Sequence, residues 1–98
     1  MTIGKTKKED ALVISLEGRL DTVTAPELES ELKESLADVT SLTFDFKALD
    51  YISSAGLRVL LSAQKIMNGR GQMKICNVNE TIMEIFEVTG FSDILTIE

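Results

Sequence analysis

The hydrophobic positions of this chain form short alternating or continuous runs separated by longer helical patterns. Residues 11–16 are apolar and rich in β-branched side chains, which predicts a largely buried strand. Residues 41–46 alternate apolar with polar and predict a second strand, and residues 73–78 predict a third. A more polar strand at residues 2–7 is expected to pair with residues 11–16 as an antiparallel hairpin, because its lysines suit a sheet edge.

Between the predicted strands at residues 11–16 and 41–46 the pattern is helical. Thr24 is followed three residues later by Glu27, a capping-box spacing that predicts a helix start with a proline in the first turn. Leu28, Leu32 and Leu36 then recur at intervals of four, so they share one buried face. The acidic positions opposite them are interpreted as a solvated surface.

Two further helices are predicted nearer the C-terminus. After a turn at residues 49–56, apolar side chains cover a wide arc and indicate a central, buried helix; they are Leu57, Leu60, Leu61, Ala63, Ile66 and Met67. Residues 68–71 are expected to end it by adopting positive φ. Asn79 is predicted to cap a last helix closed by Gly90, with a buried face made of Ile82, Ile85, Phe86 and Thr89. Residues 94–97 are expected to form a short final strand.

The predicted element order is β-β-α-β-α-β-α-β, which indicates an α/β domain whose later strands are parallel and covered by helices. A length of 98 residues with 44% hydrophobic side chains is sufficient for one self-sufficient core. We therefore expect a single domain spanning residues 1–98.

Composition excludes several classes of function. Ten basic residues against sixteen acidic ones give a net charge of −6, so nucleic acid and direct membrane binding are not expected. The chain has no histidine and a single cysteine, Cys76, which excludes histidine-based catalysis, histidine-ligated zinc and an internal disulfide. Cys76 is expected to pack in the core. With no membrane-length apolar run and no signal peptide, we expect a cytoplasmic protein without metal, cofactor or enzymatic activity.

The residues best suited to carry chemistry lie at one junction, Ser53-Ser54-Ala55-Gly56-Leu57. In a structural interpretation Ser54 is a helix N-cap worth about 1 kcal/mol, and Gly56 eases close packing. A nucleophilic serine needs a neighbouring base, which nothing in the sequence places there. A phosphorylated serine needs only exposure and a partner that detects the added charge. The residues themselves leave the structural and the phosphorylation readings open.

At this point the chain resembles the STAS domains of bacterial anti-sigma-factor antagonists, over nearly its whole length. The first signature stands here as Gly18-Arg19-Leu20-Asp21, with Thr24 opening a helix. The second stands as Phe44-Asp45-Phe46 followed by Leu49-Asp50-Tyr51-Ile52. The third and most specific is the junction Ser53-Ser54-Ala55-Gly56-Leu57. The resemblance implies a sheet of four or five strands packed against three or four helices.

The resemblance also implies site residues. The phosphoacceptor of the family falls on Ser54, with Ser53 as the second candidate, and Asp21 and Asp45 match acidic positions near it. The chain departs from the family at Ser53, where aspartate is usual, and at Arg58, where glycine is common. Because the carboxyl ends of parallel strands gather at one sheet edge, one partner-binding face is expected; its residues are Asp21, Thr22, Thr24, Ser54, Gly56, Leu57 and Arg58.

Three functions are compatible with these features. In the first, the protein sequesters an anti-sigma factor with serine kinase activity, which releases a sigma factor, until phosphorylation of Ser54 breaks the complex; a serine phosphatase reverses the modification. In the second, it is a soluble subunit of a membrane transporter, with Ser54 as a structural helix cap. Nucleotide binding is a third, although the chain has no phosphate-binding glycine loop.

Overall fold

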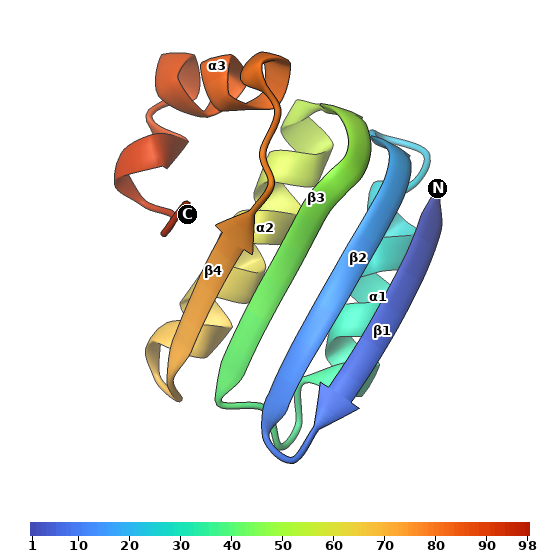
Figure 1. Cartoon of the computed structure of the whole chain (residues 1–98), viewed down its shortest axis with the longest axis vertical. Helices are drawn as coiled ribbons and strands as arrows, with labels where there is room; N and C mark the ends of the chain where they lie inside the picture. Colours follow the sequence, from blue (N-terminus) through green and yellow to red (C-terminus); the bar gives the residue numbers. More distant parts are fainter.

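The computed structural model describes residues 1–98 as four strands and three α-helices (Figure 1). Their order is β1 (Thr2–Lys8), β2 (Ala11–Leu20), α1 (Ala25–Ser35), β3 (Ser41–Ile52), α2 (Ser54–Asn68), β4 (Gln72–Cys76) and α3 (Glu80–Thr89), followed by a 3₁₀ turn at Phe91–Asp93. The prediction of an α/β domain with a mixed sheet is confirmed.

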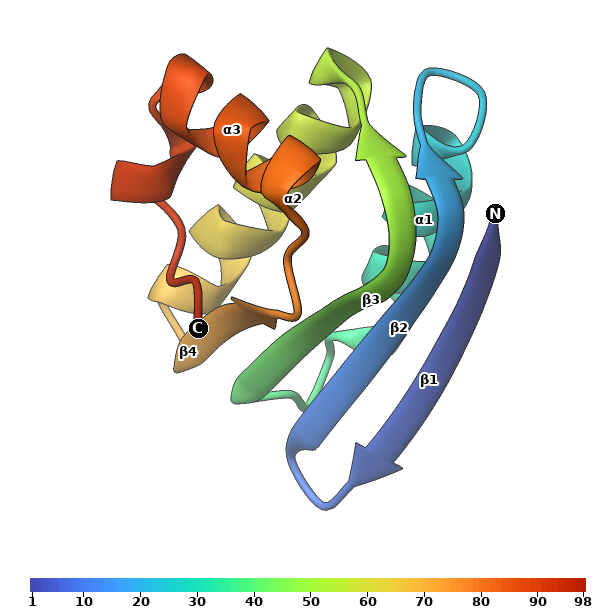
Figure 2. The same cartoon turned by 45° about the horizontal axis from the view of Figure 1, so that its top comes forward.

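The sheet has the spatial order β1-β2-β3-β4. β1 pairs with β2 antiparallel as the predicted hairpin, while β2, β3 and β4 are mutually parallel. Helices α1 and α2 cover one face of this sheet, and α3 lies beyond the end of β4 (Figures 1 and 2). The other face carries no helix, so the strands need apolar side chains on one side only.

Burial follows the two periodicities seen in the sequence. Along β2, Leu12, Ile14 and Leu16 are buried while the residues between them are exposed. Leu42, Phe44 and Phe46 occupy the same side of β3, and the three leucines at four-residue intervals in α1 are buried against them. These side chains belong to one core of 24 buried apolar residues.

Both central strands are longer than predicted. β2 continues through Gly18 to Leu20, and residues 49–52, expected to be a turn, are the end of β3. Ser15 pairs with Asp45, but Glu17 pairs with Ala48 and Arg19 with Tyr51, so β3 holds two extra residues as bulges. Each bulge interrupts the alternation of apolar and polar residues, which is why the sequence pattern ended at Phe46.

The central helix α2 is largely buried as predicted, with two corrections. Leu57, Leu60, Ala63 and Met67 are buried, but Ile66 is 41% exposed. The helix ends at Asn68 without the expected positive φ, since Gly69 has φ −91°.

The C-terminal segment confirms the predicted cap residues but not the final strand. Asn79 Oδ1 accepts a hydrogen bond from the Ile82 amide at 2.8 Å, and Gly90 has φ 82°. Ile82 and Phe86 are buried, whereas Thr89, expected on the same face, is exposed. Residues 94–97 are not a strand: after the 3₁₀ turn the chain forms a single bridge with β4, in which Ile97 lies opposite Ile75.

Cys76 is half-buried on β4 and is not fully packed in the core as expected. Burial, followed by the negative charges of Asp45 and Glu98, raises the pKa of its thiol, so the thiol stays protonated at neutral pH. No helix is both long enough and apolar enough to cross a membrane.

Gly71, between α2 and β4, lies where the chain passes very close to the backbone of Thr40. A Cβ atom at this position would lie 1.9 Å from the carbonyl oxygen of Thr40, whereas a Cβ at Gly69 meets nothing within 4 Å. We therefore expect Gly71→Ala to lower the free energy of unfolding by about 3 kcal/mol, since backbone must shift to relieve the overlap. Gly69→Ala is the matched control and should change stability by less than about 1 kcal/mol. Urea unfolding of both variants tests this, and equal stabilities would contradict it.

Candidate functional site

The carboxyl ends of β2 and β3 lie side by side. Leu20 pairs with Ile52, and the Ser53 amide donates to the Leu20 carbonyl at 2.9 Å. The loop that follows β2 therefore starts next to the start of α2, at the upper edge of the sheet in Figure 1. The two motifs that the sequence analysis placed at one sheet edge are neighbours in space.

A network of hydrogen bonds centred on Asp21 shapes the loop between β2 and α1. Asp21 Oδ1 accepts from the amides of Val23 at 3.0 Å and Thr24 at 3.2 Å. Thr24 Oγ1 accepts from the Asp21 amide at 2.8 Å and donates to the Arg19 carbonyl at 2.9 Å. Thr24 occupies the N-cap position of α1, but the predicted capping box is wrong, because this hydroxyl is engaged with the preceding loop.

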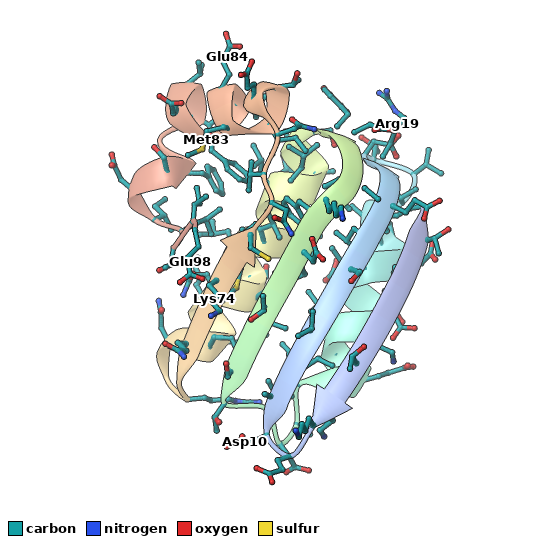
Figure 3. All side chains as sticks on the ribbon, in the orientation of Figure 1. Asp10, Arg19, Lys74, Met83, Glu84 and Glu98 are labelled. Atoms are coloured by element: carbon teal, nitrogen blue, oxygen red, sulfur yellow. The ribbon has the colours of Figure 1, made fainter.

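The same network sets the charge at this loop. The hydrogen bond from the Thr24 amide, helped by the Val23 amide and the Thr24 hydroxyl, holds the pKa of Asp21 below its usual value of 3.8. Asp21 is thus fully ionised at neutral pH. The guanidinium of Arg19 lies 3.7 Å from Asp21 Oδ2 and 4.6 Å from the centre of the Tyr51 ring, so it links the ends of β2 and β3. Figure 3 shows Arg19 at this edge of the molecule.

Val23, at the tip of this loop, is 85% exposed. The sequence analysis missed it, because an isolated valine between two threonines carries no periodic signal. Its exposure follows from the turn that Asp21 closes beneath it.

The two serines at the start of α2 have different environments. Ser53 is the N-cap, with φ −101° and ψ 177°, and Ser54 is the first helical residue, so the expectation that Ser54 is the cap is wrong. Neither side chain caps the helix with a hydrogen bond. Ser53 Oγ is buried without a partner, whereas the side chain of Ser54 is exposed.

Gly56 allows the first turn of α2 to sit directly on the ends of the central strands. A Cβ atom there would lie 2.7 Å from Leu20 Cγ and 2.8 Å from Ile52 Cγ1. Gly56 and Leu57 are both buried. Their burial leaves little of their own surface for the predicted partner contact, and they position the exposed residues around them.

A groove of about 350 Å³ runs between the N-terminal halves of α1 and α2. It brings together Thr22 and Arg58, which the sequence analysis had assigned to one face. The other residues that line it are Ala25, Pro26, Glu29, Ala55, Val59 and Ser62. The spacing of Ala55, Arg58, Val59 and Ser62 along one helix could have indicated a shared face, but only the packing of α1 against α2 makes it a groove.

Asp45 lies elsewhere, which corrects its predicted place near Ser54. It pairs with Ser15 and Cys76 in the middle of the sheet and lines a hollow on the face without helices. Ile52 follows it by seven positions along β3, a path of roughly 20 Å. The hydrogen bond from Asn77 Nδ2 at 2.9 Å, followed by that from the Lys47 amide, holds its pKa below the usual value.

Comparison with known proteins agrees with this architecture. The family model described as STAS domain matches residues 2–98. The putative anti-sigma factor antagonist BtrV of Bordetella bronchiseptica is 33% identical, over 99% of this chain and 85% of the relative. The anti-sigma-B factor antagonist of Bacillus subtilis is 27% identical, over 93% of this chain and 84% of the relative. The crystal structure of an anti-sigma factor antagonist from Mycobacterium paratuberculosis has a TM-score of 0.88 at 23% identity, covering 98% and 83% of the two chains. Because the family model spans nearly the entire sequence, this chain belongs to the STAS domain family.

Proposed function

We propose that this protein is an anti-sigma-factor antagonist that binds its anti-sigma factor through the edge where α1 and α2 begin. The relatives in Bordetella bronchiseptica and Bacillus subtilis are named for that role. One observation carries the proposal of a switch at this edge: Ser54, the family's phosphoacceptor position by resemblance, is exposed at the start of α2, next to the groove lined by Thr22 and Arg58. Phosphorylation there places charge directly on the proposed binding surface.

Accessibility supports Ser54 over Ser53 as the modified residue. A kinase must bring the serine hydroxyl into its own active site. The Oγ atom of Ser53 is buried under the first turn of α2, whereas the Ser54 side chain faces solvent. Modification at Ser53 would require the helix start to open.

The start of α2 can accept a phosphate without unfolding. The first backbone amides of a helix have no intrahelical acceptor, and the positive end of the helix dipole favours an anion. Arg58 follows Ser54 by one helical turn, so its guanidinium can approach a phosphate on that residue. We infer that phosphorylation changes the charge of the surface by about −2 and leaves the fold intact.

In this role the protein binds and does not catalyse. The anti-sigma factor supplies the serine kinase activity, a serine phosphatase removes the phosphate, and the exchange takes place in the cytoplasm, where sigma factors act. The alternative role as a transporter subunit treated Ser54 as a structural cap. That premise fails, since Ser53 occupies the cap position and neither serine makes a capping hydrogen bond.

Substitutions at Ser54 distinguish the effect of added charge on binding from any effect of the side chain on stability. Ser54→Ala removes no capping bond, so its free energy of unfolding should change by less than about 0.5 kcal/mol. It should bind the anti-sigma factor like the parent and resist the kinase. Ser54→Asp should remain folded but bind at least tenfold more weakly, because its charge lies where the phosphate would. Calorimetric titration with the cognate anti-sigma factor measures this. The charge control is Ser30→Asp, which adds the same charge at an exposed position of α1 and should bind like the parent. Equal binding by Ser54→Asp and the parent would refute the switch.

Arg58 should moderate the effect of that charge. Arg58→Ala in the Ser54→Asp background should weaken binding by more than the two single effects combined, because the arginine no longer neutralises the aspartate. A double-mutant cycle measured by calorimetry gives the coupling. Lys65→Ala, two turns further along α2, should show no coupling with Ser54→Asp. Additive effects of Arg58→Ala and Ser54→Asp would show that the arginine does not act on the site.

Asp21 should determine the shape of the binding edge. Asp21→Ala loses the hydrogen bonds to Val23 and Thr24 and should weaken binding several-fold in a protein that stays folded, whereas Asp21→Asn keeps an acceptor and should bind better than the alanine variant. Normal binding by a folded Asp21→Ala would refute this placement.

The lowered pKa of Asp21 also has a pH signature. Because the folded-state pKa lies below 3.8, the stabilisation is fully present at neutral pH and is lost as pH falls through the lowered value. Asp21→Asn should therefore lose less stability than the parent between pH 5 and pH 3. Urea midpoints at the two pH values measure the difference.

A further inference from the structure

The outer face of α3 is acidic and has no basic neighbours in its own segment. Residues 75–98 contain five acidic side chains and neither lysine nor arginine. Glu80, Glu84 and Glu87 are all exposed, and none of them takes part in an ion pair. Figure 3 shows Glu84 pointing away from the body of the protein, while Met83 beside it points inward.

Beside this row of glutamates lies an apolar groove, with Glu84 on its border. It has a volume of about 370 Å³ and is lined by Thr81, Glu84, Ile85, Val88 and Thr89, a stripe along one side of the helix. Val88 is 81% exposed, although the opposite side of the same helix buries Ile82 and Phe86 in the core. On this side of the helix Val88 is exposed and Ile85 is half-buried against the core, so part of the apolar surface remains uncovered.

Like charges along this helix repel one another. Glu84 has like-charged neighbours one turn away on both sides, Glu80 at four residues and Glu87 at three. Glu87 also lies in the last turn, next to the negative end of the helix dipole. Unfavourable local interactions of this kind are expected at sites that serve binding.

We propose that the outer face of α3 is a docking site for a basic amphipathic helix of another protein. A leucine, isoleucine or valine of that helix occupies the groove beside Val88 and Ile85, and lysine or arginine residues one turn away pair with Glu80, Glu84 and Glu87. Nucleic acid and anionic membranes are repelled by the same charges. A second copy of this face would oppose glutamate with glutamate.

The site is separate from the edge proposed to bind an anti-sigma factor. No residue that lines the α3 groove lines the groove between α1 and α2. A partner bound at α3 therefore recruits the protein without depending on the state of Ser54. This inference goes beyond the proposed function and can hold or fail independently of it.

The test uses a defined probe, an 18-residue helical peptide of leucine and lysine with leucines at positions i, i+3, i+4 and i+7. Titration into the isotope-labelled full chain, followed by NMR, should shift the amide signals of α3. The double variant Glu84→Lys with Glu87→Lys should bind at least tenfold more weakly, and Val88→Ser should also weaken binding. The matched control is Glu34→Lys with Asp38→Lys, which makes the same charge change on exposed positions at the end of α1 and should bind like the parent. Ser54→Asp should likewise bind the peptide normally.

Equal weakening by the α1 control would overturn the proposal, because the attraction would then be general. Signal shifts confined to the groove between α1 and α2 would overturn it as well. So would self-association of the parent that Val88→Ser abolishes, since the occupant would then be a second copy. Glu84→Gln with Glu87→Gln, checked by circular dichroism, keeps the test decisive if the lysine variant fails to fold.

Discussion

The close approach of Gly56 to Leu20 and Ile52 is the contact on which the arrangement of the site depends. With no Cβ in the way, the first turn of α2 rests on the ends of β2 and β3, where a side chain would lie within 2.8 Å of both core residues. The parallel pairing of Leu20 with Ile52 places those ends level, and the bond from the Ser53 amide to the Leu20 carbonyl locks them together. The Asp21 loop and the two serines are neighbours as a result.

Adjacent residues at this site have different roles. Ser53, Gly56 and Leu57 are held inside, where they position the helix, while Ser54 and Arg58 remain outside. A chemical change at Ser54 therefore alters the surface and not the packing beneath it.

The groove between α1 and α2 and the outer face of α3 differ in charge. The groove between α1 and α2 carries one acidic and one basic side chain, Glu29 and Arg58, whereas every charged side chain on α3 is acidic. A net charge of −6 thus conceals local differences that matter for recognition.

The sequence by itself determined the elements that repeat a simple period: the alternating strands at 11–16 and 41–46, the leucines of α1, and the helix bounded by Asn79 and Gly90. It also contained the motifs that identified the family and the edge where they meet. Only the tertiary structure decided where β3 bulges, that Thr24 bonds to its loop, that Ser53 is the cap, and that Asp45 lies far from Ser54. Those features depend on which strand or helix lies alongside, and a pattern along one chain does not encode a neighbour that is distant in sequence.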